Sequence, residues 1–158
     1  MKILLLFALL TLCVADLDSL REFAKPFLVK VGVVQPVNGL LECLTDATVE
    51  AWEKIYEDLE KIKWRTNDEL LVDAISVDSS GAFEIFSEVI NCSKDPIEII
   101  EIAKKINELL IDLEKLKDKL EESKERVRKL LNSQISANEE NDMNEAGESF
   151  GELIKELF

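Results

Sequence analysis

The sequence contains no histidine among its 158 residues. Histidine is the commonest general base near neutral pH and the commonest metal ligand. Its absence excludes Ser-His-Asp and Cys-His catalysis, histidine-dependent zinc sites and HExxH peptidases. Catalysis by carboxylates alone needs a pair of acids in a pocket, and the acids here follow the spacing of a helix surface. The sequence therefore predicts no enzymatic activity, no cofactor and no metal site.

The sequence also lacks an apolar run of the roughly 20 residues that span a bilayer. Its most apolar stretch, Ile3 to Leu12, is shorter, follows Lys2 and precedes the small residues that end in Ala15. This layout is typical of a secretory signal peptide. We expect residues 1–15 to be removed and the mature chain, 16–158, to reach an oxidising lumen of the secretory pathway or the cell exterior.

The chain contains far fewer basic than acidic residues. The chain has 19 Lys and Arg against 33 Asp and Glu, which gives a formal net charge of -14. The predicted signal peptide holds one lysine and no acid, so its removal makes the remainder more negative still. Such a surface repels nucleic-acid phosphates and anionic lipid head groups and attracts cations or basic partners. Nucleic acid is therefore not an expected partner, and we interpret the charge mainly as a source of solubility.

Two cysteines remain after removal of the signal peptide, Cys43 and Cys92. An even number of cysteines in an oxidising compartment favours one disulfide between them. Two thiols without histidine are too few for a structural zinc site. Asn91-Cys92-Ser93 is an N-x-S/T sequon, so Asn91 is a candidate glycosylation site at the surface. A disulfide formed early at Cys92 would hinder glycosylation of the neighbouring Asn91.

Apolar residues recur at steps of three and four along 16–158, which is the pattern of amphipathic helices. We predict an all-α protein, a single domain that forms one bundle of about four to five helices. The first helix should be shortened or kinked by Pro26 and followed by a loop at 35–38. The second is expected over 40–63, with an interruption near Thr45.

A third helix is expected after a cap at Thr66 or Asn67. Its apolar pattern extends to Ile90. Polar residues at 78–81 predict a kink or a division into two shorter helices. Its acidic residues are interpreted as a solvated face.

The clearest helix start is Asp95-Pro96-Ile97-Glu98, with a capping aspartate, a proline in the first turn and a glutamate at the capping-box position. From it we predict one long helix over about 96–131, in which apolar residues follow a heptad register with one polar interruption. We favour packing of this helix within the bundle over an intermolecular coiled coil, because it holds only about four heptads.

Residues 132–144 are rich in Asn, Ser and Glu and are predicted to form a mobile loop. A short terminal helix is expected over 143–158. Within it, Gly147 and Gly151 lie four residues apart on one face, which allows a neighbouring backbone to come close. We therefore expect the terminal helix to dock tightly on the bundle.

The C-terminal run from Asn144 to Ile154 resembles the Ala-Gly-x-x-hydrophobic-Gly-x-x-hydrophobic ending of a family of small secreted helical proteins of ciliates. Proteins of that family similarly begin with a signal peptide and carry a few cysteines on amphipathic helices. The resemblance implies a secreted helical architecture. Because the family has no established activity, it implies no mechanism. The motif residues here are Ala146, Gly147, Phe150, Gly151 and Ile154.

Two functions remain open. The first is a secreted or lumenal, non-enzymatic bundle that acts by interaction with a protein partner or by self-assembly. The alternative is a carrier that holds a lipid or sterol between its helices. The aromatic residues that would line such a site, and that core packing would equally use, are Phe23, Phe27, Trp52, Phe83, Phe86 and Phe150.

Overall fold

The computed structural model describes residues 16–158, so the predicted signal peptide lies outside the described residues. Every regular element of the described chain is a helix, which confirms the predicted all-α bundle. Six α-helices and two short 3-10 helices follow in the order α2 (Leu17–Val31), η1 (Leu40–Cys43), α3 (Asp46–Lys61), α4 (Asp68–Val89), η2 (Ile90–Cys92), α5 (Pro96–Ile111), α6 (Leu113–Glu139) and α7 (Met143–Glu156).

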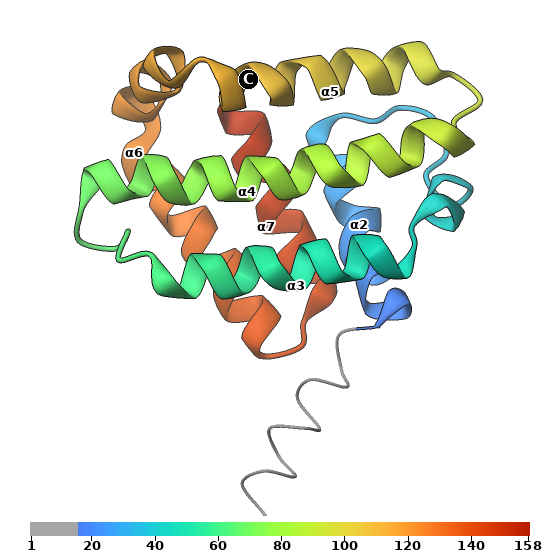
Figure 1. Ribbon diagram of the computed structural model, residues 1–158, viewed down its shortest axis with the longest axis horizontal. Helices are drawn as coiled ribbons and strands as arrows, with labels where there is room; N and C mark the ends of the chain where they lie inside the picture. The colour runs from blue at the N-terminus through green and yellow to red at the C-terminus, as the bar shows by residue number, and fades with distance from the viewer. Residues whose placement is uncertain (1–15) are drawn as a thin grey trace, which may run out of the picture.

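The helices form two layers that cross at a steep angle (Figure 1). Helices α3, α4 and α5 lie side by side in one layer, and α2, α7 and the C-terminal part of α6 run across them in the other. The core lies between the layers, and its largest fully buried side chains include Trp64, Phe23, Phe27 and Phe86. Burial of these apolar side chains is the main favourable contribution to folding.

Local signals set several helix ends. Asp16 accepts the backbone N–H of Ser19 at 2.8 Å and caps α2, which continues through its internal proline. Gly32 ends α2 with a φ of 113°, a left-handed conformation that favours glycine. The expected interruption near Thr45 is present, because η1 and α3 are separate helices. Asn67 caps α4 by accepting two backbone N–H groups.

The long helix predicted over 96–131 is divided in the structure. Asp112 has φ -113° and ψ 82°, outside the helical region, so α5 ends at Ile111 and α6 begins at Leu113. The Asp112 side chain accepts the backbone N–H of Lys115 at 3.1 Å and thereby caps α6. The prediction of one helix was wrong because the apolar spacing continues across this capped break.

The loop predicted over 132–144 is mostly helical. Helix α6 continues to Glu139, and the connection to α7 is confined to 140–142. Gln134, Ile135 and Ala137 are buried in this last part of α6. Tertiary packing thus outweighs the weak helix propensity of the neighbouring Asn and Ser residues.

Helix α4 runs without a break through 78–81, where the sequence predicts a kink or two helices. Asp78 and Ser79 are buried in the core. Gly81 leaves room for α3, since a Cβ there would lie 3.2 Å from the Ile55 side chain. Asp78 and Gly81 therefore face α3, and residues 78–81 do not form a turn.

The first and last described helices, α2 and α7, pack backbone against backbone. A Cβ at Gly147 would overlap the carbonyl oxygen of Phe23 and would lie 2.8 Å from Cγ of Pro26. A Cβ at Gly151 would lie 2.9 Å from the carbonyl oxygen of Phe27. Contacts this short leave no space for a side chain, so the predicted tight docking of the terminal helix is confirmed.

The substitution Gly147→Ala tests this contact. At an unhindered helix position, alanine stabilises relative to glycine by about 1 kcal/mol. Here the added methyl group forces α2 and α7 apart, so we expect the free energy of unfolding to fall by about 1–3 kcal/mol in urea denaturation. Gly39→Ala is the matched control, because no described atom lies within 4 Å of its added Cβ. Equal stability of the two variants would contradict the close contact.

Candidate functional site

Five of the aromatic residues predicted to line an apolar-ligand site form one packed cluster. The rings of Phe27 and Phe150 are stacked with their centroids 4.5 Å apart. The ring of Phe23 lies 5.4 Å from that of Phe150 and 5.3 Å from that of Trp52. Phe86 meets Phe27 edge to face at 5.8 Å. The rings therefore contact one another and fill the space between the two layers.

The space left beside this cluster is small. A hollow lined in part by Phe23, Trp52 and Phe150 has a volume of about 10 Å³. This is room for about one water molecule, whereas sites for drug-sized ligands enclose about 300–1,000 Å³. Phe83, the sixth aromatic residue, is half-buried at the margin of the core. Binding of a lipid by these residues stays a prediction, and it would require the layers to separate.

A polar cluster of three residues lines the same hollow, at a point where three helices meet. Gln134 of α6 donates from Nε2 to Oδ1 of Asp78 on α4 at 2.9 Å, and to the hydroxyl of Tyr56 on α3 at 3.3 Å. The exposed fraction of Asp78 is 0% and that of Gln134 is 1%. We call Tyr56, Asp78 and Gln134 the Asp78 cluster. It joins both layers through side chains.

The surroundings of the Asp78 cluster favour neutral side chains. Burial raises the pKa of Asp78 to about 7, and the hydrogen bond from Gln134 offsets only part of this effect. Burial, and then the negative charge of Asp78, raise the pKa of Tyr56, so its phenol stays protonated. The residues that line the hollow include no lysine or arginine. Asp78 can therefore exchange a proton near neutral pH but has no cationic partner there.

The chemistry of this cluster is limited to that proton. The acid, phenol and amide are enclosed in the core, so a substrate has no access to them. Within residues 16–158, no group of three or more Cys, Asp and Glu side chains is placed to hold a metal ion. The cluster therefore links α3, α4 and α6 inside the core.

The sequence interpretation of the α4 acids as a solvated face was wrong for Asp78. The helical spacing of Asp78 indicates that it is buried, because it lies four residues after Ala74 and four before Ala82, and both alanines are fully buried. Gln134 was likewise placed in a loop, although it lies between Leu131 and the buried end of α6. Helical spacing alone could have placed both residues on core faces.

The predicted cysteine pair joins the two 3-10 helices. Cys43 of η1 and Cys92 of η2 are bonded, with their Cα atoms 5.8 Å apart, a usual separation for a disulfide. Cys43 is buried and Cys92 is exposed. Asn91, the candidate glycosylation site, is exposed beside Cys92. The structure thus leaves Asn91 accessible, and its glycosylation stays a prediction.

Polar contacts around the disulfide fasten the loop after α2 to the start of α5. The Gln35 amide nitrogen donates to the carbonyl of Asp95 at 3.0 Å, and the Ser93 hydroxyl donates to the Gln35 amide oxygen at 2.9 Å. Glu98 accepts the backbone N–H of Val34 at 3.1 Å. The side chain of Asp95 makes no capping bond within the described chain, so the predicted capping box is not formed. Glu98 holds the loop instead.

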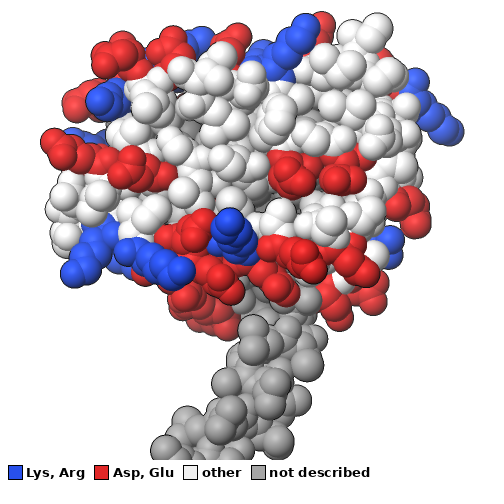
Figure 2. Space-filling model, viewed as in Figure 1, with Lys and Arg blue, Asp and Glu red and all other residues white. Residues whose placement is uncertain are grey.

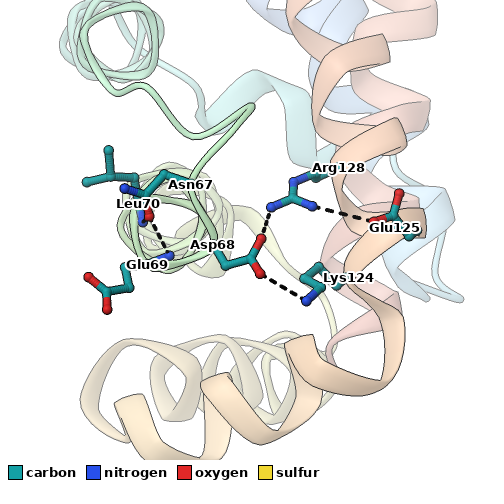
Figure 3. A network of polar contacts seen from close by, with 7 residues as sticks. All are labelled: Asn67, Asp68, Glu69, Leu70, Lys124, Glu125 and Arg128. Carbon is teal, nitrogen blue, oxygen red and sulfur yellow. Dashed lines mark hydrogen bonds and ion pairs between the residues drawn. The ribbon is translucent and has the colours of Figure 1, made fainter.

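A surface network joins the start of α4 to α6 (Figure 3). The Asp68 carboxylate contacts Lys124 at 3.0 Å and also Arg128, which contacts Glu125 at 3.5 Å. The hydrogen bonds from Lys124 and Arg128 lower the pKa of Asp68. Because Asp68 is exposed, solvent screens these charges. The network therefore connects α4 to α6 but contributes little to the stability of the fold.

Comparison of the chain with protein-family models, with curated proteins and with solved structures gives no match. The likeness to secreted ciliate proteins stays a prediction. None of the helices in residues 16–158 is long and apolar enough to cross a membrane. The function must therefore be inferred from the packing and surface described above.

Reduction of the disulfide should destabilise the protein. The bond links residues 49 positions apart in the sequence. Closing a loop of this length removes unfolded-chain entropy equivalent to about 4 kcal/mol in the simple model. We expect the free energy of unfolding to fall by roughly that amount in Cys43→Ser/Cys92→Ser, measured by guanidinium denaturation. Adding a reductant should lower the stability of the wild type and leave the double variant unchanged. Equal stability of wild type and variant would contradict a stabilising bridge.

Proposed function

We propose that this protein is a non-enzymatic helical bundle of the secretory route that acts through its surface, by protein interaction or by self-assembly. The observation that carries the proposal is a set of exposed isoleucines on one side of α5. Ile97, Ile100 and Ile111 expose 68%, 38% and 74% of their surface. We call these three residues the α5 stripe. A filled core beside exposed isoleucines favours a binding surface over an internal carrier site.

The geometry of α5 places these isoleucines together. Residues three apart are neighbours on a helix, and residues 14 apart are separated by nearly four whole turns. The three isoleucines therefore lie on one side of α5 over about 21 Å. The exposed charged residues Lys104 and Glu108 lie on the same side between Ile100 and Ile111. Val34 and Leu113, at its two ends, expose 87% and 48% of their surface. Helix α5 lies at the outer edge of its layer, with α4 on its inner side (Figure 1).

The charge of the remaining surface limits which partners can approach. Carboxylates gather in a band along the lower part of the face in Figure 2, over and below α3. Partial burial, then repulsion from Glu57 and Glu50, raise the pKa of Glu53 on α3. Two copies of such a chain repel each other unless cations neutralise part of the charge. Assembly should therefore strengthen in the presence of a divalent cation.

Light scattering of the secreted form tests assembly. We expect a mass above that of the monomer at high protein concentration, and a further increase in millimolar calcium. The variant Ile97→Ser/Ile111→Ser should lower the association constant roughly tenfold or more, because it removes two large apolar side chains from the stripe. Val29→Ser is the matched control, since Val29 exposes 54% of its surface but belongs to α2 and is not a residue of the stripe. Its association should equal that of the wild type.

Two results would contradict the proposal. One is a strict monomer with and without calcium at high concentration, which would contradict the self-assembly part. The other is a lipid that copurifies in native mass spectrometry and quenches the fluorescence of Trp52 or Trp64, which would favour the carrier.

A further inference from the structure

Asp78 occupies the junction of three helices from both layers. It lies on α4, accepts a hydrogen bond from Gln134 of α6, and through Gln134 is connected to Tyr56 of α3. We propose that Asp78 is a proton-operated latch, which holds α3, α4 and α6 together when its carboxyl group is protonated and weakens their junction when the proton is lost. This inference does not depend on assembly.

The hydrogen bonds around Asp78 suit a protonated carboxyl group. Gln134 Nε2 donates to Oδ1, while Asp78 Oδ2 and Gln134 Oε1 are buried without a hydrogen-bond partner among the described residues. A carboxylic acid has one donor and one acceptor, as does the edge of a primary amide. A proton on Oδ2 would therefore allow the pair to form two bonds, and both unpartnered atoms would be satisfied. The ionised carboxylate can accept only one of these bonds.

The groups that face Asp78 give no compensation for a negative charge. Tyr56 from α3 is a phenol, Gln134 from α6 is uncharged, and Glu84 from α4 is another acid. Phe23 of α2 and Phe150 of α7 complete the apolar side of the hollow. With a volume of about 10 Å³, the hollow admits about one water molecule, too few to hydrate a carboxylate. Ionisation therefore leaves a poorly solvated charge inside the core.

The direction of the pH effect follows from the raised pKa of Asp78. Its pKa is about 7 in the folded protein and 3.8 in an exposed aspartate. Between these values the folded protein binds a proton that the unfolded chain has lost, so stability is greatest in acid and falls as pH rises through 7. Because the chain has no histidine, no side chain of ordinary pKa titrates between pH 5 and 8. Asp78 is therefore the group that would dominate this interval.

Urea denaturation between pH 5 and pH 8, at low protein concentration, tests the latch. We expect the folding equilibrium constant of the wild type to fall roughly a hundredfold over this interval. Asp78→Asn should remove most of this dependence, because its amide is permanently neutral and can make both bonds to Gln134. Asp73→Asn is the matched control, since Asp73 is an exposed acid on the same helix. It should retain the full dependence of the wild type.

Infrared spectroscopy of the wild type gives a second test that needs no variant. The absorption of a protonated carboxyl group should persist above pH 6 and fall to about half near pH 7. The proposal is overturned if wild-type stability is constant or rises between pH 5 and 8, or if Asp78→Asn shows the same fall as the wild type. Should that variant not fold, a protonated carboxyl in the infrared spectrum above pH 6 supports the latch, and its absence refutes it.

Discussion

The close approach of α2 and α7 is the contact on which the remaining packing depends. Gly147 and Gly151 let these helices meet at backbone distance, and Phe150 then contacts both Phe23 and Phe27. The aromatic rings of α2 contact Trp52 of α3 and Phe86 of α4 in the crossing layer. The result is a filled centre. A solid core of this kind directs the search for function to the surface and to the few buried groups that can change state.

The Asp78 cluster is a group of buried polar side chains within the mainly apolar core. Buried polar groups have few ways to satisfy their hydrogen bonds, so they disfavour packings in which their partners are displaced. Asp78 and Tyr56 belong to one layer and Gln134 to the other. The cluster therefore favours one alignment of the two layers, whereas contacts between apolar side chains tolerate several alignments. The same limited set of partners makes the alignment sensitive to one proton.

Much of the fold could be predicted from the sequence because its signals are local. Apolar spacing gave the helical class, and the glycine pair gave the docking of α7. The break at Asp112 was missed because a capping aspartate can equally occupy an exposed helix position. The helical course of 132–139 and the burial of Asp78 depend on Gln134, which lies 56 residues from its partner. Helical spacing puts Asp78 on the core face of α4, and the prediction failed because an acid is normally solvated.

The pairing of α2 with α7 also determines when the protein can finish folding during its own synthesis. Of the described helices, α2 is made first and α7 last. Phe23 and Phe27 are consequently made before Phe150, their partner on α7. At about 5–20 residues per second, synthesis of the intervening chain takes on the order of ten seconds. A nascent chain in this state presents an aromatic helix face with no partner. Helix α7 therefore covers the aromatic face of α2 that is made earlier in synthesis.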